Sequence, residues 1–323
     1  MDTPATSSEV AEQINKAQSS WVAHESPRFK GMTLGQVKKM CGTVLKDEPG
    51  FKGLPEKEGT NFENIVSNIP DSFDSRDQWK QCPSIGHVRD QSSCGSCWAF
   101  GSTEAFNDRR CIATGDDTLM SPEDTVACCG FFQCFSQGCN GGQPGMAWKW
   151  FTSHGVVSGA DYGETDGSTC LPYSLPPCAH HVTSSKYKPC PSKEYSTPKC
   201  VSTCSESAFP GKYSSDKKKA KSAYSVSGVA KIQSDIMTYG PVTGAFSVYS
   251  DFPNYKSGVY KHTSGSMLGG HAIKIIGWGT EDGEDYWLVV NSWNESWGDN
   301  GTFKILRGVD ECGIESQISA GQV

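Results

Sequence analysis

The chain has no run of apolar residues long enough to cross a bilayer. A membrane-spanning helix needs about 20 consecutive, mostly apolar residues, and the 323-residue sequence contains no such run. The N-terminus, Met1-Asp2-Thr3-Pro4, also lacks the apolar core of a signal peptide. We therefore expect no membrane span. Because the cysteine content described below indicates the secretory route, we also expect that a leader has been removed.

Basic stripes and paired metal-binding motifs are missing as well. Lys and Arg number 29 against 36 Asp and Glu, and the net charge is −7. No Lys/Arg stripe indicates a nucleic-acid partner, and the short run Lys217-Lys218-Lys219 is interpreted as a solvated loop. Cys94 and Cys97 form one Cys-x-x-Cys pair, but no second pair completes a structural zinc site. We expect neither a metal nor another cofactor.

Cysteine, by contrast, is abundant. The 15 cysteines lie mainly between Cys82 and Cys204, and so many are unusual in a cytosolic protein that binds no metal. We expect an oxidising compartment and a disulfide framework, with at least one unpaired thiol because the count is odd. Asn294-Glu295-Ser296 and Asn300-Gly301-Thr302 are glycosylation sequons compatible with that compartment.

The N-terminal part of the chain, residues 1–68, differs from the rest. It holds one cysteine, Cys41, and Leu34, Val37, Met40 and Cys41 fall on one helical face. The stretch that follows, about 47–68, has no such pattern. The sequence predicts an N-terminal unit and a linker, followed by a main domain over residues 69–323.

The main domain changes from helix to strand signals along its length. The part from about 80 to 155 predicts helices that begin at Cys97, at Ser121-Pro122 and after Gly142. Residues 156–210, rich in Pro, Ser and Cys, are expected to be loops held by disulfides. Strands are predicted at 245–249, 272–278, 286–290 and 302–306. A helical half beside a strand half favours a ligand cleft between them.

Cys97 is the candidate nucleophile because it begins a predicted helix. The positive end of the helix dipole favours a thiolate there. Taken alone, a cysteine in this chain is better interpreted as half of a disulfide. His271 and Asn291 change that interpretation, because they flank two predicted strands, 272–278 and 286–290, joined by a polar loop. In an antiparallel hairpin the start of the first strand lies beside the end of the second, so the two residues should be neighbours.

These residue types suit nucleophilic catalysis. An imidazole beside a thiol can lower its pKa from about 8.5 to about 3–4, and the imidazolium can protonate a leaving amine. Asn291 would orient the ring of His271. The backbone N–H of Cys97 and the side-chain amide of Gln91 would donate to an oxyanion, each such donor typically contributing about 3–4 kcal/mol.

The run Cys94-Gly95-Ser96-Cys97-Trp98 matches the local signature of papain-type proteases. Gln91, the run Gly138-Cys139-Asn140-Gly141-Gly142, Gly270-His271-Ala272 and Asn291-Ser292-Trp293 are also similar to that family, and the chain resembles its cathepsin B-like members. The resemblance implies an α+β, papain-like fold with a helical half (about 80–155), an antiparallel β-barrel-like half (about 156–312) and a cleft between them. It implies a cysteine peptidase with catalytic residues Cys97, His271, Asn291 and Gln91, and with substrate contacts from Gly141, Gly142, Trp293, Ala272 and Gln317.

His271 and Asn291 follow Cys97 by 174 and 194 residues, more than the 130–150 expected in the family. The cysteine-rich segment supplies the excess. Within it, residues 178–190 with the preceding Pro176-Pro177 resemble the occluding loop of cathepsin B. Taken alone, His180 and His181 could belong to a solvated loop or a weak metal site. The resemblance instead implies that they bind a substrate's C-terminal carboxylate. It further implies removal of C-terminal dipeptides alongside endopeptidase cleavage.

Some positions depart from the cathepsin B pattern. Asp90 and His180 preserve one of the two contacts that latch the loop, but Lys186 and Ser296 stand at the second, so we expect a loop that opens more easily. Gln317 stands where the family has an acidic residue in the S2 pocket. This predicts a weakened preference for Arg at P2. Gln143 replaces an aromatic residue of the pocket wall.

The resemblance also implies a disulfide pattern and an inhibitory propeptide. The implied pairs are Cys82–Cys111, Cys94–Cys139, Cys128–Cys200, Cys129–Cys134, Cys170–Cys204 and Cys178–Cys190, which leave Cys41, Cys97 and Cys312 free. Residues 1–68, with Gly31-Met32-Thr33-Leu34 and the run from Lys38 to Thr43, resemble the cathepsin B propeptide. They would run backwards through the cleft, cover Cys97, and be released by cleavage near Asn68–Asp71.

The expected partners are peptide and protein substrates, the chain's own propeptide and cystatin-like inhibitors. The enzyme is expected to be a monomer in a lysosomal or secreted location. Two other hypotheses remain. A catalytically silent binding or inhibitory protein on the same fold would usually lack the Cys or the His. A thiol–disulfide oxidoreductase using Cys94 and Cys97 would need a thioredoxin-like βαβ context, which the preceding sequence does not supply.

Overall fold

The computed structural model describes residues 2–57, 68–178, 188 and 193–323. His180, His181, Lys186 and Cys190, which carry predictions made from the sequence, lie outside the described residues. None of the helices in the described part has both the length and the apolar composition of a membrane span.

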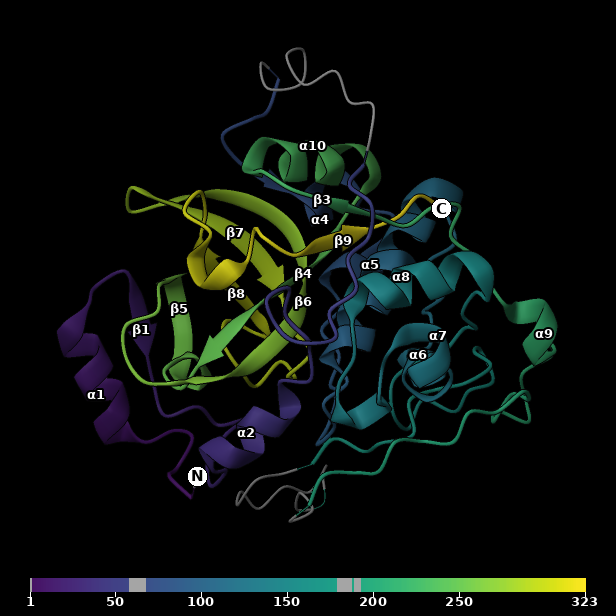
Figure 1. Ribbon diagram of the computed structural model, residues 1–323, viewed down its shortest axis with the longest axis horizontal. Coiled ribbons are helices and arrows are strands. Elements are labelled where there is room, and N and C mark those ends of the chain that lie inside the picture. The colour runs from purple at the N-terminus through teal and green to yellow at the C-terminus, as the bar shows by residue number, and fades with distance from the viewer. Residues whose placement is uncertain (1, 58–67, 179–187, 189–192) are drawn as a thin grey trace.

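The main domain consists of a helical half and a sheet half that face each other (Figure 1). The helical half holds α5 (Cys97–Thr114), α6 (Pro122–Cys128), α7 (Phe131–Cys134) and α8 (Pro144–Ser153). The predicted helix starts at Cys97 and Ser121 are confirmed, and Gly115 ends α5 in the left-handed conformation with φ 77°. The third predicted helix is α8, with Trp148 and Phe151 buried.

The sheet half contains nearly all the strands. They are β2 (Phe73–Asp74), β3 (Tyr224–Val226), β4 (Val242–Tyr249), β5 (Tyr255–Tyr260), β6 (Met267–Glu281), β7 (Glu284–Val290), β8 (Thr302–Leu306) and β9 (Ile318–Ala320). With β1 (Trp21–Ala23) of the N-terminal segment, the described strands follow the order β1-β5-β8-β7-β6-β4-β9-β3, with β2 beside β6. Among the paired strands that the structure describes, only β5 and β8 are parallel. The α+β fold is confirmed, with the qualification that the sheet path ends at β1 and β3 instead of closing into a barrel.

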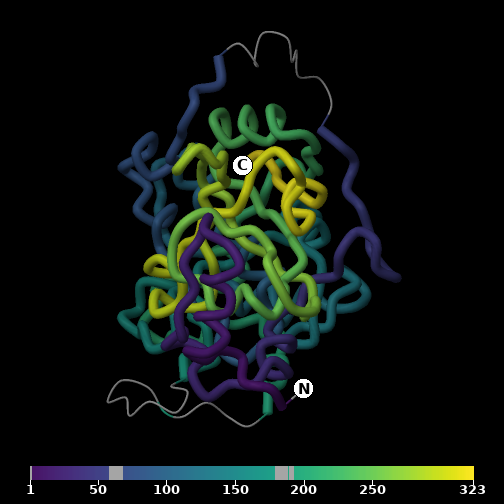
Figure 2. The backbone as a smooth tube through the Cα atoms, turned by 90° about the vertical axis from the view of Figure 1, so that its left-hand side faces the viewer, coloured from purple at the N-terminus to yellow at the C-terminus, as the bar shows by residue number. Residues whose placement is uncertain are grey.

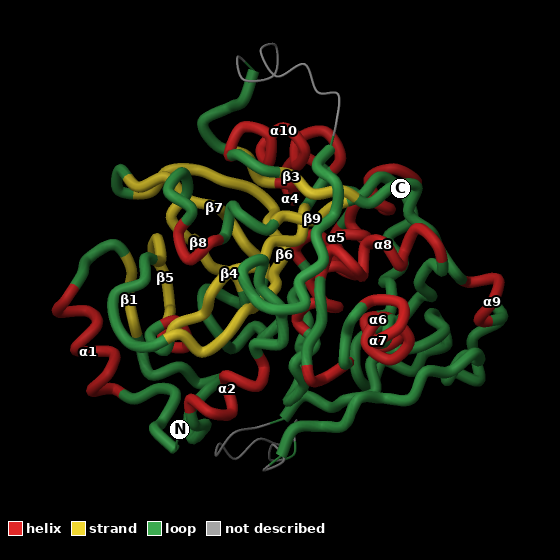
Figure 3. The backbone as a smooth tube through the Cα atoms, in the orientation of Figure 1, coloured by secondary structure: helices red, strands yellow, loops and turns green. Residues whose placement is uncertain are grey.

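The N-terminal segment, residues 2–57, adds to this sheet. Helix α1 (Ser8–Ala17) leads into β1 (Trp21–Ala23), which pairs antiparallel with β5. Helix α2 (Leu34–Met40) begins with a capping box between Thr33 and Gln36 and buries Val37 and Met40, as the periodicity predicts. Figure 2 shows the purple start of the chain lying across the strands. After α2 the segment runs as a loop between helices and sheet (Figure 3).

The remaining helices and 3₁₀ turns complete the described structure. They are α4 (Ser75–Gln78), α9 (Tyr213–Asp216), α10 (Val229–Tyr239) and the 3₁₀ turns Pro83–Gly86, Gly138–Asn140, Phe252–Asn254 and Glu311–Gly313. Among described residues between α8 and α9 there is no helix or strand, as expected for 156–210. The halves meet closely where Gly101 of α5 lies against β6, since a Cβ there would stand 3.1 Å from the carbonyl oxygen of Ile273.

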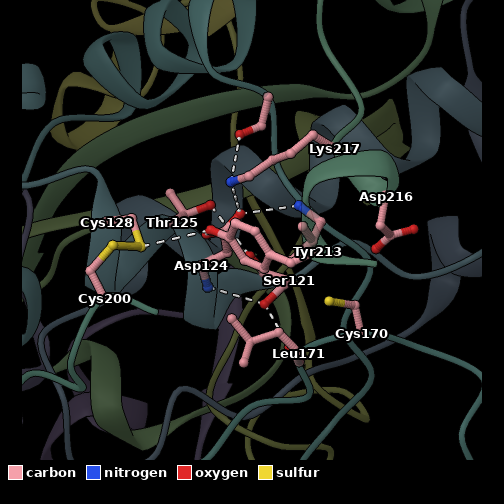
Figure 4. A network of polar contacts seen from close by, with 12 residues as sticks. Ser121, Asp124, Thr125, Cys128, Cys170, Leu171, Cys200, Tyr213, Asp216 and Lys217 are labelled. Atoms are coloured by element: carbon pink, nitrogen blue, oxygen red, sulfur yellow. Dashed lines mark hydrogen bonds and ion pairs between the residues drawn. A yellow bond between two sulfur atoms is a disulfide. The ribbon is translucent and has the colours of Figure 1, made fainter. Parts of the chain in front are cut away.

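A buried carboxylate fastens the loop-rich segment to α6 (Figure 4). Asp124 accepts hydrogen bonds from the Tyr213 hydroxyl (2.5 Å), the Lys217 ammonium (2.6 Å) and the Val157 amide (3.1 Å). Its own amide donates to the capping Ser121 hydroxyl at 3.1 Å. The interpretation of Lys217 as part of a solvated run is therefore wrong. Its side chain is 16% exposed, because the buried charge of Asp124 needs a partner.

Among cysteines that the structure describes, five disulfides cross-link the helical half and its loops. They are Cys82–Cys111, Cys94–Cys139, Cys128–Cys200, Cys129–Cys134 and Cys170–Cys204, the same pairs that the family resemblance implies. The sixth implied pair includes Cys190, outside the described residues. Among described cysteines, Cys41, Cys97 and Cys312 are free.

Candidate active site

Cys97 lies at the first position of α5, fully buried between the two halves. The first N–H groups of a helix have no intrahelical acceptor, so its start is a region of positive potential. The neighbouring Cys94 is bonded to Cys139. The sulfur of Cys97 is consequently a free thiol at a helix start, which is where a thiolate is favoured.

His271 and Asn291 are brought together as the hairpin argument predicts. Nε2 of His271 lies 2.8 Å from Oδ1 of Asn291, and both side chains are fully buried. Oδ1 also accepts from the Ser292 amide at 2.8 Å. An oxygen held between two donors fixes the ring plane and places the proton on Nε2, which leaves Nδ1 for Cys97.

The hairpin of β6 and β7 has a shorter connecting loop than the sequence predicts. His271 lies inside the long strand β6 rather than before its start, and pairs across to Phe246 of β4. The strands β6 and β7 stay paired as far as Glu281 and Glu284. The turn is therefore Asp282-Gly283, with φ of 51° and 82°, and not the longer loop 279–285. An Asp-Gly pair is a strong signal for such a two-residue turn.

The surroundings of Cys97 favour its ionised form. Burial is the largest single effect and opposes ionisation, but it is outweighed by the charge of His271 together with polar contacts from His271, Thr43 and the backbone of Ala272. The net effect lowers the pKa of the Cys97 thiol below its usual value. The two other free cysteines behave in the opposite way, because burial raises the pKa of Cys41 and of Cys312.

Gln91, the residue expected to donate to an oxyanion, contacts both the turn that leads to Cys97 and the N-terminal segment. Its Oε1 accepts from the Ser292 hydroxyl at 2.8 Å, which directs Nε2 toward the cleft. There Nε2 donates to the carbonyl oxygens of Cys94 (2.8 Å) and Met40 (2.9 Å). A carbonyl of the N-terminal segment therefore occupies a donor that a reacting carbonyl would use.

The N-terminal segment passes directly over the nucleophile. The Thr43 hydroxyl lies 3.2 Å from the Cys97 sulfur. The Thr43 amide donates to the Gly270 carbonyl at 3.0 Å, and Gly142 bonds to the segment through both its amide (to Gly42, 2.8 Å) and its carbonyl (from Val44, 3.0 Å). Gly142, singled out as a substrate contact, thus contacts a backbone laid through the cleft. Gly141 also lies against the segment, since a Cβ there would stand 3.0 Å from the carbonyl oxygen of Gly42.

Gln317 and Gln143 hold the next residues of the segment. Gln317 accepts from the Lys46 amide at 2.7 Å and donates to the Val44 carbonyl at 3.0 Å. Gln143 accepts from the Lys52 amide at 2.7 Å. Both neutral side-chain amides therefore bind the backbone of the N-terminal segment.

Trp293 covers the other side of the histidine. Its ring centroid lies 4.5 Å from that of His271 and 5.0 Å, edge-on, from that of Phe29. Its carbonyl accepts from Nε of Arg28 at 3.0 Å, and Arg28 also pairs with Asp90 at 3.5 Å. The sequence interpretation missed Arg28, because its partner Trp293 lies 265 residues away in the chain and no local pattern marks the contact.

The family model of papain family cysteine proteases matches residues 69–322. The chain belongs to this family of cysteine peptidases. It is 44% identical over 316 residues to cathepsin B-like cysteine proteinase 6 of Caenorhabditis elegans, covering 97% of this chain and 82% of the relative. It is 45% identical over 321 residues to cathepsin B-like cysteine proteinase 4 of the same organism, covering 98% and 92%.

Solved proenzymes share the whole arrangement. Procathepsin B S9 from Trypanosoma congolense superposes with a TM-score of 0.83 at 32% identity, covering 99% of both chains. Procathepsin L2 from the midgut of Tenebrio molitor larvae gives 0.69 at 26% identity, covering 98% of this chain and 88% of the other. The match extends over residues 2–57, so this cysteine peptidase has the architecture of a proenzyme.

The glycosylation candidates differ in accessibility. Asn300 is exposed, whereas Asn294 is half-buried and its Nδ2 donates to Asp90 at 3.2 Å. Asn300 therefore offers the more accessible amide of the two sequons.

Proposed function

We propose that this cysteine peptidase is a zymogen that cleaves peptide bonds through a thiolate–imidazolium pair of Cys97 and His271. The observation that carries the proposal is the free thiol of Cys97, with a lowered pKa, beside a histidine fixed by Asn291. Catalysis by such a pair needs a nucleophile, a proton carrier and an orienting group within reach of one another.

The proposed reaction follows from these positions. The Cys97 thiolate attacks the scissile carbonyl carbon, and Gln91 Nε2 and the Cys97 amide stabilise the oxyanion. His271 gives its proton to the leaving amine, which departs and leaves a thioester. His271 then takes a proton from water as the water attacks the thioester, and the acid product leaves as the thiolate returns.

The prosegment, residues 1–68, is proposed as an intramolecular inhibitor. Thr43 covers the nucleophile, the Met40 carbonyl uses the Gln91 donor, and Gly142 is engaged on both sides. Peptide and protein substrates can enter only after this backbone leaves. Release follows cleavage near Asn68–Asp71.

The cathepsin B resemblance supports a peptidyl-dipeptidase activity beside endopeptidase cleavage. His180 and His181, which lie outside the described residues, are proposed to bind a substrate's C-terminal carboxylate. Because Lys186 and Ser296 replace the second latch, we expect a substantial endopeptidase share. The ratio of kcat/KM for internally cleaved peptides and for peptides with a free C-terminus measures this share, and a negligible endopeptidase value would count against an easily opened loop.

Gln317 is proposed to weaken the preference for Arg at P2. Its neutral amide offers hydrogen bonds but no charge to a guanidinium. A P2 library should show Phe accepted at least as well as Arg, and Gln317→Glu should shift the ratio toward Arg. A strong preference of the wild type for Arg would contradict this.

We further propose a lysosomal or secreted monomer, open to cystatin-like inhibitors after activation. The oxidoreductase hypothesis is wrong, because Cys94 is paired with Cys139 rather than available to Cys97. The catalytically silent alternative is not favoured, because Cys97, His271, Asn291 and Gln91 are all present and placed together.

Acidification of the purified proenzyme tests the proposal. The wild type should shorten to a product that begins near Ile69 and gain activity, whereas Cys97→Ala should keep its full length under the same conditions. Full activity of wild-type protein of unchanged length would contradict the proposed role of the prosegment.

A further inference from the structure

The part of the prosegment that follows α2 contacts the peptidase domain at Thr43, and again further along the chain at Lys57. The ammonium of Lys57 lies 2.8 Å from Oδ2 of Asp235. It also stands over two rings, 3.9 Å from the ring centroid of Tyr239 and 4.8 Å from that of Tyr224. A carboxylate with two aromatic faces is a recognition site for an ammonium group.

The site is built by the peptidase domain and does not depend on Lys57 for its shape. The Asp235 carboxylate, 2% exposed, pairs with the buried Arg109 guanidinium at 2.5 Å. It also accepts from the Tyr224 hydroxyl. Arg109 in turn donates to the carbonyls of Gly240 and Gly321. With Lys57 gone, Asp235 would keep its charge partner, so the pocket would stay formed and anionic on its open side.

A strand edge adjoins this pocket. β3 is the last strand of the sheet path, and Ser225 in its middle bonds to the prosegment on its outer side. The Ser225 amide donates to Pro55 O at 2.9 Å, the Lys57 amide donates to Ser225 O at 3.0 Å, and the Ser225 hydroxyl donates to Leu54 O at 3.1 Å. Departure of the prosegment would leave two backbone groups of an edge strand unpaired, an arrangement that binds extended peptides.

We propose that Asp235, Tyr224, Tyr239 and the outer edge of β3 form a lysine-binding exosite, filled by Lys57 in the proenzyme and able to rebind the segment Leu54–Lys57 after cleavage. The part that concerns the cleaved enzyme rests on the proposed activation near Asn68. Such a cut leaves Lys57 on the released piece, so this exosite prolongs the attachment of the cleaved prosegment without touching Cys97.

The ammonium site can be tested in the full-length proenzyme without proteolysis. In a Cys97→Ala background, Lys57→Ala should lower the melting temperature, and n-butylammonium should restore part of the loss while 1-butanol should not. Lys52→Ala is the matched control, because Lys52 stands over the ring of Phe135 but forms no ion pair with a carboxylate of the residues that the structure describes. The ammonium site would be overturned if n-butylammonium and 1-butanol raised the melting temperature of Lys57→Ala equally. It would also be overturned if n-butylammonium raised the melting temperatures of Lys57→Ala and Lys52→Ala equally.

The ring contribution has its own variants. Tyr239→Phe in the Lys57→Ala protein should keep the n-butylammonium effect, and Tyr239→Ala should reduce it severalfold. Asp235 is left unchanged, because its loss would strand Arg109. An effect that survives Tyr239→Ala undiminished would remove this ring from the site.

Rebinding is tested on the processed enzyme with Cys97 blocked by a covalent inhibitor, so that the cleft cannot bind peptide. Acetyl-Leu-Pro-Glu-Lys-amide should bind at least tenfold more tightly than the same peptide with norleucine for lysine, and the intact proenzyme should bind neither. Equal binding of the two peptides, or no saturable binding, would overturn the rebinding. Absence of processing is visible as unchanged chain length and contradicts the proposed activation, while the amine experiment still decides the ammonium site.

Discussion

The Thr43 hydroxyl lies 3.2 Å from the sulfur of Cys97. This contact joins the prosegment to the nucleophile, and it also contributes to the lowered pKa of Cys97. The prosegment therefore covers a thiol that is already disposed to ionise. The proposed inhibition would therefore depend on excluding the substrate and not on keeping the sulfur protonated.

Gly42→Ala should loosen this cover. A Cβ at Gly42 would stand 1.9 Å from the carbonyl oxygen of Gly95, which is backbone and cannot swing away. We expect the variant proenzyme to hydrolyse a small fluorogenic peptide before acidification and to process faster than wild type. Gly53→Ala is the matched control, because its Cβ would meet only a Phe51 ring carbon at 3.6 Å. Equal latency of Gly42→Ala and wild type would show that close packing at this point does not maintain inhibition.

Gln91→Glu should separate the oxyanion donor from packing. The variant keeps the size of the side chain and an acceptor for the Ser292 hydroxyl, but it loses the Nε2 donor. Loss of one oxyanion donor typically lowers kcat by about 10²–10³, so we expect a fall of this order in the activated enzyme with little change in KM. Ser292→Ala, which removes only the support of Gln91, should cost less. An unchanged kcat for Gln91→Glu would exclude this role.

Asn291→Ala should act through the ring of His271. Without the Oδ1 acceptor at 2.8 Å the imidazole loses its fixed plane, and misplacement of a catalytic group by about 1 Å can cost on the order of 10²-fold. We expect a fall in kcat/KM of this order, with partial retention in Asn291→Gln. Equal activity of Asn291→Ala and wild type would mean that Trp293 packing alone orients the ring.

Cys97 should react with iodoacetamide at acidic pH. Because the pKa of Cys97 is lowered whereas that of Cys312 is raised, alkylation of the activated enzyme at Cys97 should have a lower pH midpoint than alkylation at Cys312. His271→Ala should move the midpoint upward, because it removes the cation that offsets burial. Peptide mass mapping at each pH measures the alkylation of Cys97. The same pH midpoint in the wild type and in His271→Ala would contradict the ion pair.

The candidate catalytic residues were predictable because each has a local signal. Cys97 begins a helix with a recognisable stop at Gly115, and the hairpin rule brings His271 beside Asn291. The five described disulfides could not be deduced from spacing, since cysteine counts allow many pairings. They followed from the resemblance alone.

The contacts that hold the prosegment were not predictable. Lys57 and Asp235 are separated by 178 residues, and Arg28 contacts Trp293 across 265. Such pairs depend on how the sheet folds, not on any local pattern. For Lys217 a local pattern existed but led to a wrong prediction. A run of lysines favours a solvated loop, whereas the fold brings the buried carboxylate of Asp124 beside this side chain.

Glu104 should make the fold more stable at acidic than at neutral pH. Burial raises the pKa of Glu104 to about 7, although Lys274 nearby lowers it. In the unfolded chain the pKa of Glu104 is 4.5, so the unfolded chain loses this proton at a lower pH than the folded state does. The free energy of unfolding therefore falls as the pH rises from about 4.5 to 7. The effect has an upper limit of about 3 kcal/mol.

Urea unfolding of the Cys97→Ala proenzyme at pH 5 and pH 7.5 measures this effect. Glu104→Gln should shrink the difference between the two pH values, whereas Glu12→Gln, at a side chain 72% exposed, should leave it as it is. A pH difference of the same size in Glu104→Gln would contradict the assignment.

The most direct test of the account is labelling with a peptidyl epoxide, read by mass mapping before and after acidification. We expect the full-length proenzyme to resist the reagent, and the processed enzyme to take up one equivalent on Cys97 with complete loss of activity. Processed and active enzyme that carries no label on Cys97, or that is labelled elsewhere, would contradict it.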